Sequence, residues 1–333
     1  MNAPLSAQGT RMSFVHRFII ACAAILTMGV ASAQEYPSRP IRLVVAYAAG
    51  GGTDIAARIF AESLAKVLQT PVFVENKTGA SGNIGGDFVA KAAPDGYTLL
   101  FGAMANLAIN PHLFKDMPYR PERDFTPIAE VFDTSHVIVA GPGPKITSLG
   151  QLVTEARANP GKFTFASAGG GTSTHVVGEL FAQATGTSLR HIPYRGNGPA
   201  LVDVMSGQVD LMFDQVPNSA PYIATRKVAA LAVTSEKRLG SLPDVPTVGE
   251  LGYPQLVTSS WTGLFAPAHL PPSIVAKLND ASSKVLANAE TRAKLEKVGA
   301  MPMYSSAEAM SRLLQGDSKR FGALVQRAGI KLD

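Results

Sequence analysis

A chain of 333 residues is long enough for one large or two ordinary domains. Its composition, 46% hydrophobic and 17% charged, excludes a disordered chain, and its single cysteine excludes a small scaffold held together by disulfides. The formal net charge of +5 is too small to indicate a nucleic-acid or membrane-surface partner.

Residues 1–33 have the layout of a secretory signal peptide. Basic residues precede an uncharged apolar run at residues 18–30, and small residues follow it. This run is shorter than the roughly 20 apolar residues that cross a bilayer. We predict cleavage after Ala33 and export to the periplasm, with an uncleaved anchor as the alternative and Met12 as an alternative start. The excised segment carries two arginines, no acid and the only cysteine, so the mature chain has a net charge of +3.

Short apolar runs alternate with helical patterns along the rest of the chain. We expect strands at residues 41–47, 72–74, 97–101, 163–166, 189–193, 209–213 and 228–234. Composition or apolar spacing predicts helices over residues 53–69, 83–92, 273–289 and 307–325. Such alternation is typical of α/β architecture with mostly parallel sheets.

Two long extended runs, at residues 131–141 and 256–267, indicate crossings between domains. They enclose a central segment, which we expect to form a domain inserted into the first one. We therefore predict a lobe 1 made of residues 34–135 plus 257–333 and a lobe 2 made of residues 136–256. We expect a mostly parallel, helix-flanked sheet in each lobe.

The pentapeptide Ala-Gly-Gly-Gly-Thr occurs twice, at residues 49–53 and 168–172, each time between a strand pattern and a helix pattern. Backbone N–H groups at a helix start lack partners and carry the positive end of the helix dipole. Glycine also lets a ligand approach the backbone closely. We therefore expect an anion site at each turn, and two such turns in two lobes indicate a shared cleft. The alternative is that the glycines only make tight turns.

A carboxylate fits these loops better than a phosphate. Neither loop has the G-K-[ST] or G-x-G-x-x-G pattern of phosphate-binding loops. Asp54, just inside the first helix, argues against a dense phosphate cluster; it either complements the helix dipole or holds a ligand ammonium or hydroxyl. We expect the hydroxyls of Thr53, Thr172 and Ser173 to cap the helices.

Signals for an enzyme are weak. The six histidines stand at no metal-ligand spacing. Ser173 and His175 would serve a secreted hydrolase, but the G-x-S-x-G elbow is missing and residues two apart on a helix face different ways. We predict a binding protein without catalysis, cofactor or metal, and keep the hydrolase as an alternative.

The chain resembles the Bug (TctC-like) family of extracytoplasmic solute receptors of tripartite tricarboxylate transporters. The stretches that carry the resemblance are residues 36–66, 75–102, 159–181, 192–214 and 231–254, together with the closing AGIKLD. The resemblance implies a two-lobed periplasmic binding protein fold of type II, with α/β lobes around a hinge. It also implies a small organic carboxylate held in the cleft by backbone amides and bridging waters. It further implies large and small (TctA-like and TctB-like) permease subunits as partners, or a sensor-kinase ectodomain for a receptor without its own permease. We expect a monomer that binds no nucleic acid.

The resemblance carries over to particular residues of the two loops, of the P-Y-[KR]-G motif and of the F-D motif at a strand end. Arg195 is the best candidate for pairing with a carboxylate, although it could also brace its loop or face solvent. Relatives commonly have hydroxyl residues where this chain has Met104 and Ala105, which indicates a ligand with an apolar or aromatic portion. We expect Trp261 to pack near the hinge. The predicted ligand-binding residues are Ala48, Ala49, Gly50, Gly51, Asp54, Met104, Ala105, Ser167, Gly170, Gly171, Thr172, Ser173, Tyr194, Arg195, Gly196 and Asp214.

Overall fold

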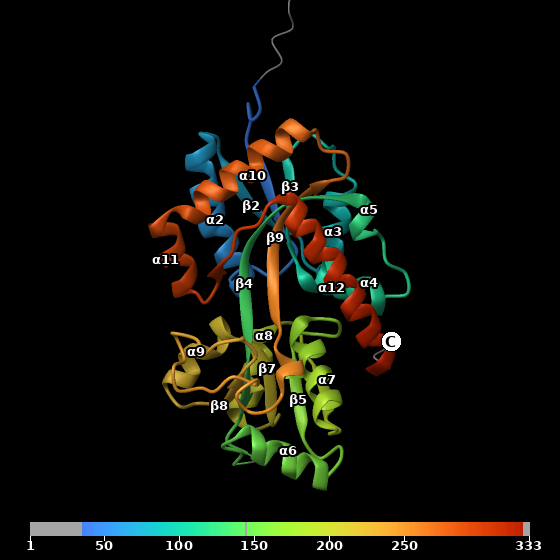
Figure 1. The fold of residues 1–333 in the computed structure, drawn as a ribbon, viewed down its shortest axis with the longest axis vertical. Helices are drawn as coiled ribbons and strands as arrows, with labels where there is room; N and C mark the ends of the chain where they lie inside the picture. Colours follow the sequence, from blue (N-terminus) through green and yellow to red (C-terminus); the bar gives the residue numbers. More distant parts are fainter. Residues whose placement is uncertain (1–34, 144, 329–333) are drawn as a thin grey trace, which may run out of the picture. The chain divides into compact units, whose positions relative to one another are not determined.

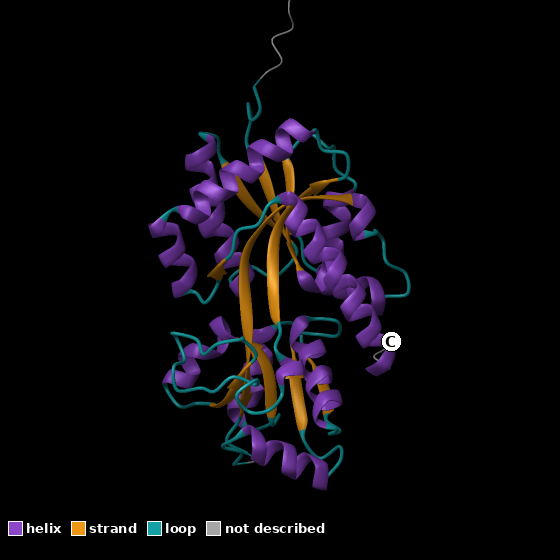
Figure 2. Cartoon of the chain, viewed as in Figure 1, coloured by secondary structure: helices purple, strands orange, loops and turns teal. Residues whose placement is uncertain are grey.

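The computed structural model describes residues 35–143 and 145–328, so the predicted signal peptide lies outside the described residues. From Arg39 onward the chain forms one compact unit. Its strands make a mixed sheet in the order β2-β1-β3-β9-β4-β7-β5-β6, with β10 and β8 also paired to β4 (Figures 1 and 2). The predicted α/β class is confirmed. In the described part of the chain, no helix combines the length and apolarity that a membrane crossing requires.

We keep the names lobe 1 and lobe 2 for the predicted ranges; their boundaries stay a prediction. The strands of lobe 1 are β1 (Ile41–Val45), β2 (Val72–Asn76), β3 (Thr98–Ala103), β9 (Ser259–Pro267) and β10 (Met301–Pro302). Its helices are α2 (Gly52–Leu68), α3 (Asn83–Ala90), α4 (Asn110–Leu113), α5 (Pro121–Asp124), α10 (Pro272–Ala287), α11 (Ala289–Lys297) and α12 (Ala307–Ala328). Short helical turns lie at Ala80–Gly82 and Ala105–Ile109.

Lobe 2 has the same order of strand and helix. Its strands are β5 (Thr164–Ser167), β6 (Arg190–Pro193), β7 (Leu211–Gln215) and β8 (Ala229–Val233). Its helices are α6 (Leu149–Ala158), α7 (Ser173–Thr185), α8 (Asn197–Ser206) and α9 (Val216–Ala224), and a short turn lies at Pro254–Leu256. Strand β4 (Phe125–Ala140) runs through both lobes (Figure 1).

The pairing is parallel within each lobe and antiparallel where the chain crosses. β1 pairs in parallel with β2 and β3, and β5 pairs in parallel with β6 and β7. β4, β8, β9 and β10 make antiparallel pairs instead. The expectation of mostly parallel sheets thus holds for the strands that precede the glycine loops, but it missed the antiparallel strands around the crossing. The central strand β1 is almost fully buried because helices cover both faces of a parallel sheet.

The expected helix over residues 273–289 is interrupted. α10 ends at Ala287, and the Asn288 side chain accepts a hydrogen bond at 2.9 Å from the Thr291 N–H to start α11. An asparagine in this position caps a new helix more favourably than it continues an old one. α10 and α11 pack against α2, while α12 packs against β4 and the turn at Ala105–Ile109.

The crossing is held together by backbone and hydroxyl contacts. β4 pairs with β9 as far as Ser135 and with β7 from His136 onward. Thr234, just after β8, accepts a hydrogen bond from the His136 N–H at 3.0 Å, and its hydroxyl donates to the Thr258 carbonyl at 2.6 Å. Trp261 packs beside this crossing as expected, and its Nε1–H donates to Asp317 of α12 at 2.7 Å.

Candidate functional site

A cavity of about 890 Å³ is lined by both lobes. From lobe 1 it receives the segments that follow β1, β2 and β3, and from lobe 2 those that follow β5, β6 and β7. All six segments leave the carboxyl ends of strands that pair in parallel with a neighbour. Ligands of open α/β sheets bind at these ends, since the side chains and helix starts there converge on one crevice.

Five helices begin at this cavity with no side-chain cap. Their N-cap residues are Gly51 of α2, Gly82 of α3, Thr172 of α7, Gly196 of α8 and Gln215 of α9. Two helices away from the cavity differ, because Ser148 caps α6 and Asn288 caps α11 with their side chains. Because the first amides of a helix have no partner within it, the uncapped starts offer the cavity several N–H donors and positive dipole ends.

The prediction that hydroxyls cap α2 and α7 is wrong. Thr172 occupies the N-cap position of α7, but its hydroxyl donates at 2.7 Å to the Gly169 carbonyl instead of accepting from the helix. Thr53 lies inside α2, whose N-cap is Gly51. The Thr172 hydroxyl thus ties down the second glycine loop, and the first amides of α7 receive no hydrogen bond from it.

The first glycine loop is anchored by Asp54. One carboxylate oxygen accepts from the Gly50 N–H at 2.9 Å, and both oxygens accept from the Arg58 guanidinium at 3.0 Å. Asn76 of β2 donates a further hydrogen bond at 2.8 Å. Burial alone would raise the pKa of Asp54, but these donors together hold it below its ordinary value of 3.8. With its oxygens engaged and its side chain buried, Asp54 shapes the loop and does not line the cavity.

The second glycine loop rests on a pair of stacked histidines. The Gly171 N–H donates to His175 Nδ1 at 3.2 Å, and the His175 ring stacks on that of His191 with 3.8 Å between centroids. His191 in turn lies 2.6 Å, Nε2 to Oγ, from Ser167. Burial and the neighbouring His175 lower the pKa of His191 to about 3, so this ring stays neutral under the loop.

This arrangement does not make Ser173 and His175 a catalytic pair. His175 Nδ1 is occupied by the Gly171 amide, and Nε2 lies 3.7 Å from Glu179, an acid one helical turn further on. Ser167, the serine of this loop that contacts a histidine, is fully buried and does not line the cavity. The hydrolase alternative therefore lacks its nucleophile–base contact.

Tyr194, Arg195 and Gly196 line the cavity, as predicted from their motif. The Gly196 N–H donates to the Ala168 carbonyl at 3.1 Å, which couples this segment to the second glycine loop. The Tyr194 hydroxyl donates to Asp203 at 2.5 Å, so the polar end of this side chain is already used. Among the described residues that line the cavity, Arg195 is the only charged one.

The structure divides the predicted ligand-binding residues into two groups. Those that line the cavity are Ala48, Ala49, Gly50, Gly51, Ala105, Thr172, Ser173, Tyr194, Arg195 and Gly196. Those that do not are Asp54, Met104, Ser167, Gly170, Gly171 and Asp214. Met104 is 1% exposed and packs into the core of lobe 1, so it does not make the cavity edge apolar. Asp214 is fully buried; its oxygens accept from Gln215, Asn218 and Ser219, which fixes the start of α9.

Sequence reasoning missed several lining residues. The missed residues include Thr78, Ala80, Ser81, Asn197, Leu201, Met205, Asn218, Tyr222, Ser260 and Thr262. Two signals could have found some of them: the segment 78–82 follows a predicted strand, and Asn197, Leu201 and Met205 recur every four residues on one helix. Ser260 and Thr262 alternate along β9 with Trp261, which therefore faces away.

One hydrogen bond joins the lobes across the cavity. The Ser81 hydroxyl of lobe 1 donates to the carbonyl of Gly170 in the second glycine loop at 2.7 Å. Because this contact exists only when the lobes approach each other, it favours the closed arrangement.

Replacing Ser81 by alanine should weaken ligand binding about threefold to tenfold. The loss corresponds to one net hydrogen bond of about 1 kcal/mol. Isothermal titration measures it, and Ser63→Ala serves as the control because Ser63 contacts Thr291 within lobe 1 at 2.8 Å. Equal affinities for both variants and the parent protein would show that this bond has no part in closure.

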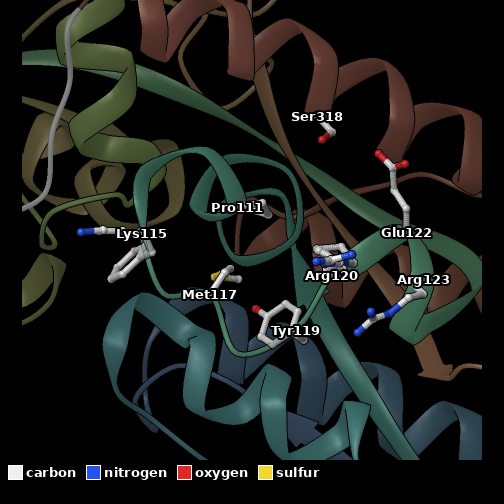
Figure 3. Close-up of a pocket in the computed structure, with 10 residues that line it drawn as sticks. Pro111, Lys115, Met117, Tyr119, Arg120, Glu122, Arg123 and Ser318 are labelled. Atoms are coloured by element: carbon white, nitrogen blue, oxygen red, sulfur yellow. The ribbon is translucent and has the colours of Figure 1, made fainter.

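A smaller cavity of about 540 Å³ lies on lobe 1 alone, between α4, α5 and α12 (Figure 3). Lys115, Arg120 and Arg123 are among its lining residues, and Arg123 is already paired with Asp124 at 2.6 Å. The five helix starts that face the larger cavity do not reach it. The larger cavity is therefore the candidate binding site.

The fold and the larger cavity define a two-lobed solute-binding protein. The sequence model described as "Tripartite tricarboxylate transporter family receptor", TctC, matches residues 56–330. The chain is 36% identical to BugT of Bordetella pertussis over 92% of this chain and 96% of that protein. It belongs to the TctC family of periplasmic solute receptors.

Two solved relatives come from Rhodopseudomonas palustris. One, a structure with adipate, has a TM-score of 0.84 and 33% identity, and the match covers 89% of this chain and 99% of that one. The other, MatC with bound malate, has a TM-score of 0.80 and 34% identity, covering 87% of this chain and 100% of that one.

Proposed function

We propose that this protein captures a small organic carboxylate between its lobes and delivers it to a membrane permease of the tripartite tricarboxylate type. One observation carries the proposal: uncapped starts of helices from both lobes face a single cavity, and Arg195 is the only charged residue among the described residues that line it. A carboxylate matches hydrogen-bond donors of this kind. The adipate and malate in the two R. palustris relatives support this ligand class.

Binding would proceed lobe by lobe. One carboxylate docks on the amides at the start of α2, where Asp54 holds the loop in place. Closure then brings the second glycine loop and Arg195 onto the ligand and excludes water. A ligand shifts this equilibrium only as far as it prefers the closed arrangement, which is the arrangement a permease would recognise. No covalent step is needed at any stage.

The screen that tests this function uses protein purified from a periplasmic extract, so that any leader has been processed. Mono-, di- and aromatic carboxylates are added separately and the midpoint of thermal unfolding is followed. A ligand at a hundred times its Kd adds about 2.7 kcal/mol of stability, which raises the midpoint measurably. If no carboxylate shifts the midpoint of the folded protein, the proposal is wrong.

Replacing Arg195 by glutamine should weaken carboxylate binding about 10-fold to 100-fold while stability stays unchanged. A hydrogen bond to a charged group contributes about 1.5–3 kcal/mol, and Arg195 is exposed, so the fold does not depend on it. Titration calorimetry gives the Kd, and Arg190→Gln, on β6 and outside the cavity, is the matched control. Equal binding by the Arg195 and Arg190 variants would exclude a contact between Arg195 and the ligand.

A further inference from the structure

One wall of the cavity is apolar, and it belongs to lobe 2. Leu201 and Met205 of α8 and Tyr222 of α9 line it, and all three pack on the core of that lobe. Resting on the function proposed above, we propose that the ligand is a monocarboxylate with an aryl or branched alkyl body, which lies against this wall, and that it carries no amino group.

The side chains along α8 indicate how the ligand is oriented in the cavity. Asn197, Leu201 and Met205 lie at intervals of four residues and so share one helix face. The face begins at the uncapped start of α8, beside Arg195, and reaches Met205 after about 12 Å of helix. On α9, Tyr222 lies one turn beyond Asn218, near the uncapped start of that helix. Both helices therefore present polar groups at their starts and apolar side chains further along.

The polar end is equipped for one carboxylate. Arg195 lies there, beside the uncapped start of α8. Further along the wall, the Tyr194 hydroxyl is held by Asp203, so it is not available to a ligand. A second carboxylate placed against the side chains of Leu201 and Met205 would lose its hydration without gaining a partner, which is unfavourable.

An ammonium group has no acceptor of opposite charge in this cavity. No aspartate or glutamate is among the described residues that line it, and the nearby Asp54 carboxylate is fully engaged by Gly50, Arg58 and Asn76. Amino acids are therefore expected to bind more weakly than the corresponding acids without an amine. The volume of about 890 Å³ lies in the upper part of the range of small-molecule sites and leaves room for a ring.

Calorimetry with three probes tests the single carboxylate, the apolar body and the missing amino group separately. It uses the whole mature protein, purified after any leader has been removed. Succinate is 3-phenylpropanoate with the ring replaced by a second carboxylate, and phenylalanine is 3-phenylpropanoate with an added ammonium group. We expect 3-phenylpropanoate to bind at least tenfold more tightly than either. If succinate or phenylalanine binds as tightly or more tightly, the inference is wrong while the carboxylate receptor stands. If neither these probes nor malate and adipate bind, the proposed function itself fails.

Substitution of Met205 locates the apolar body. Met205→Gln should weaken 3-phenylpropanoate at least fivefold and leave a short diacid such as succinate within twofold, whereas Met205→Leu should retain both affinities. Met303→Gln is the control because Met303 is exposed on lobe 1, outside the cavity. Should the Met205→Gln variant lose stability, Tyr222→Asn provides a second test on the other helix. An equal loss for both ligands, or none for 3-phenylpropanoate, would overturn the placement on this wall.

Discussion

Replacing Asp54 by alanine should lower the free energy of unfolding by about 2–4 kcal/mol and weaken ligand binding at least tenfold. Asp54 accepts hydrogen bonds from Gly50, Arg58 and Asn76 while its own side chain is 3% exposed. Arg58 is half exposed and can recover solvent contacts, which keeps the loss below that of a fully buried ion pair. Asn76 is only partly exposed and loses an acceptor, and the Gly50 N–H loses the contact that ties it to α2. The first glycine loop then loses the anchor that presents its amides.

Urea unfolding and titration calorimetry measure the two losses separately. Asp280→Ala is a matched control, since Asp280 also pairs with a basic residue one helical turn later, Lys284, but is 60% exposed. We expect that control to cost less than about 0.5 kcal/mol. Asp54→Asn keeps the shape and one acceptor oxygen, so its effects should be intermediate. Unchanged affinity in Asp54→Ala, once folded protein is assured, would show that the loop holds its shape without this anchor.

The same residue gives a pH dependence of known sign. Because the pKa of Asp54 in the folded protein is below its ordinary value, the carboxylate stabilises the fold above that ordinary value. The contribution is lost as the pH falls through the lower folded pKa. The difference in stability between the parent protein and Asp54→Ala should therefore be constant near neutrality and shrink only below about pH 4.

The order of strands and helices was predictable because each buried face requires apolar residues at the spacing of its strand or helix. β1 needs a nearly continuous apolar run, which only Arg42 interrupts, and α12 needs apolar residues at helical spacing. The glycine loops were predictable because a strand-to-helix turn beside a ligand leaves few alternatives to glycine. The antiparallel pairing of β4 with β9 carried no comparable signal, since it joins segments more than a hundred residues apart.

The cavity was only partly predictable because its residues depend on which way each side chain faces. Met104 and Ala105 are neighbours, yet Ala105 lines the cavity and Met104 is in the core. Asp54 stands where a ligand contact would be expected, but a basic residue one turn later and an asparagine on β2 engage it. Leu201 and Met205 fit an ordinary core stripe, and only the packing of α8 beside α9 exposes them to the cavity.

Replacing His136 by leucine should stabilise the protein, and more at pH 5 than at pH 7. His136 of β4 is fully buried, and neither ring nitrogen has a hydrogen-bond partner among the described residues. Its contacts to Thr234 use the backbone and survive the substitution. Removing two unsatisfied buried nitrogens should add about 1–3 kcal/mol at pH 7.

The additional gain at pH 5 comes from proton binding. Burial lowers the pKa of His136 to about 4, so at pH 5 the unfolded chain is protonated at this residue and the folded protein is not. Native stability therefore falls as the pH drops from about 6.5 towards 4, by about 2 kcal/mol at pH 5. The leucine variant is free of this loss.

The parent protein alone would not reveal this effect, because other buried groups oppose it. Burial raises the pKa of Glu130 to about 7 and that of Asp214 to about 6, so each takes up a proton in the folded state and adds stability as the pH falls. The observable is therefore the difference between His136→Leu and the parent protein in urea unfolding at pH 7 and pH 5. His112→Leu, at an exposed histidine, controls for loss of an imidazole as such. If the difference is the same at both pH values, His136 is protonated equally in the folded and unfolded chains and the crossing strand tolerates a charge at its centre.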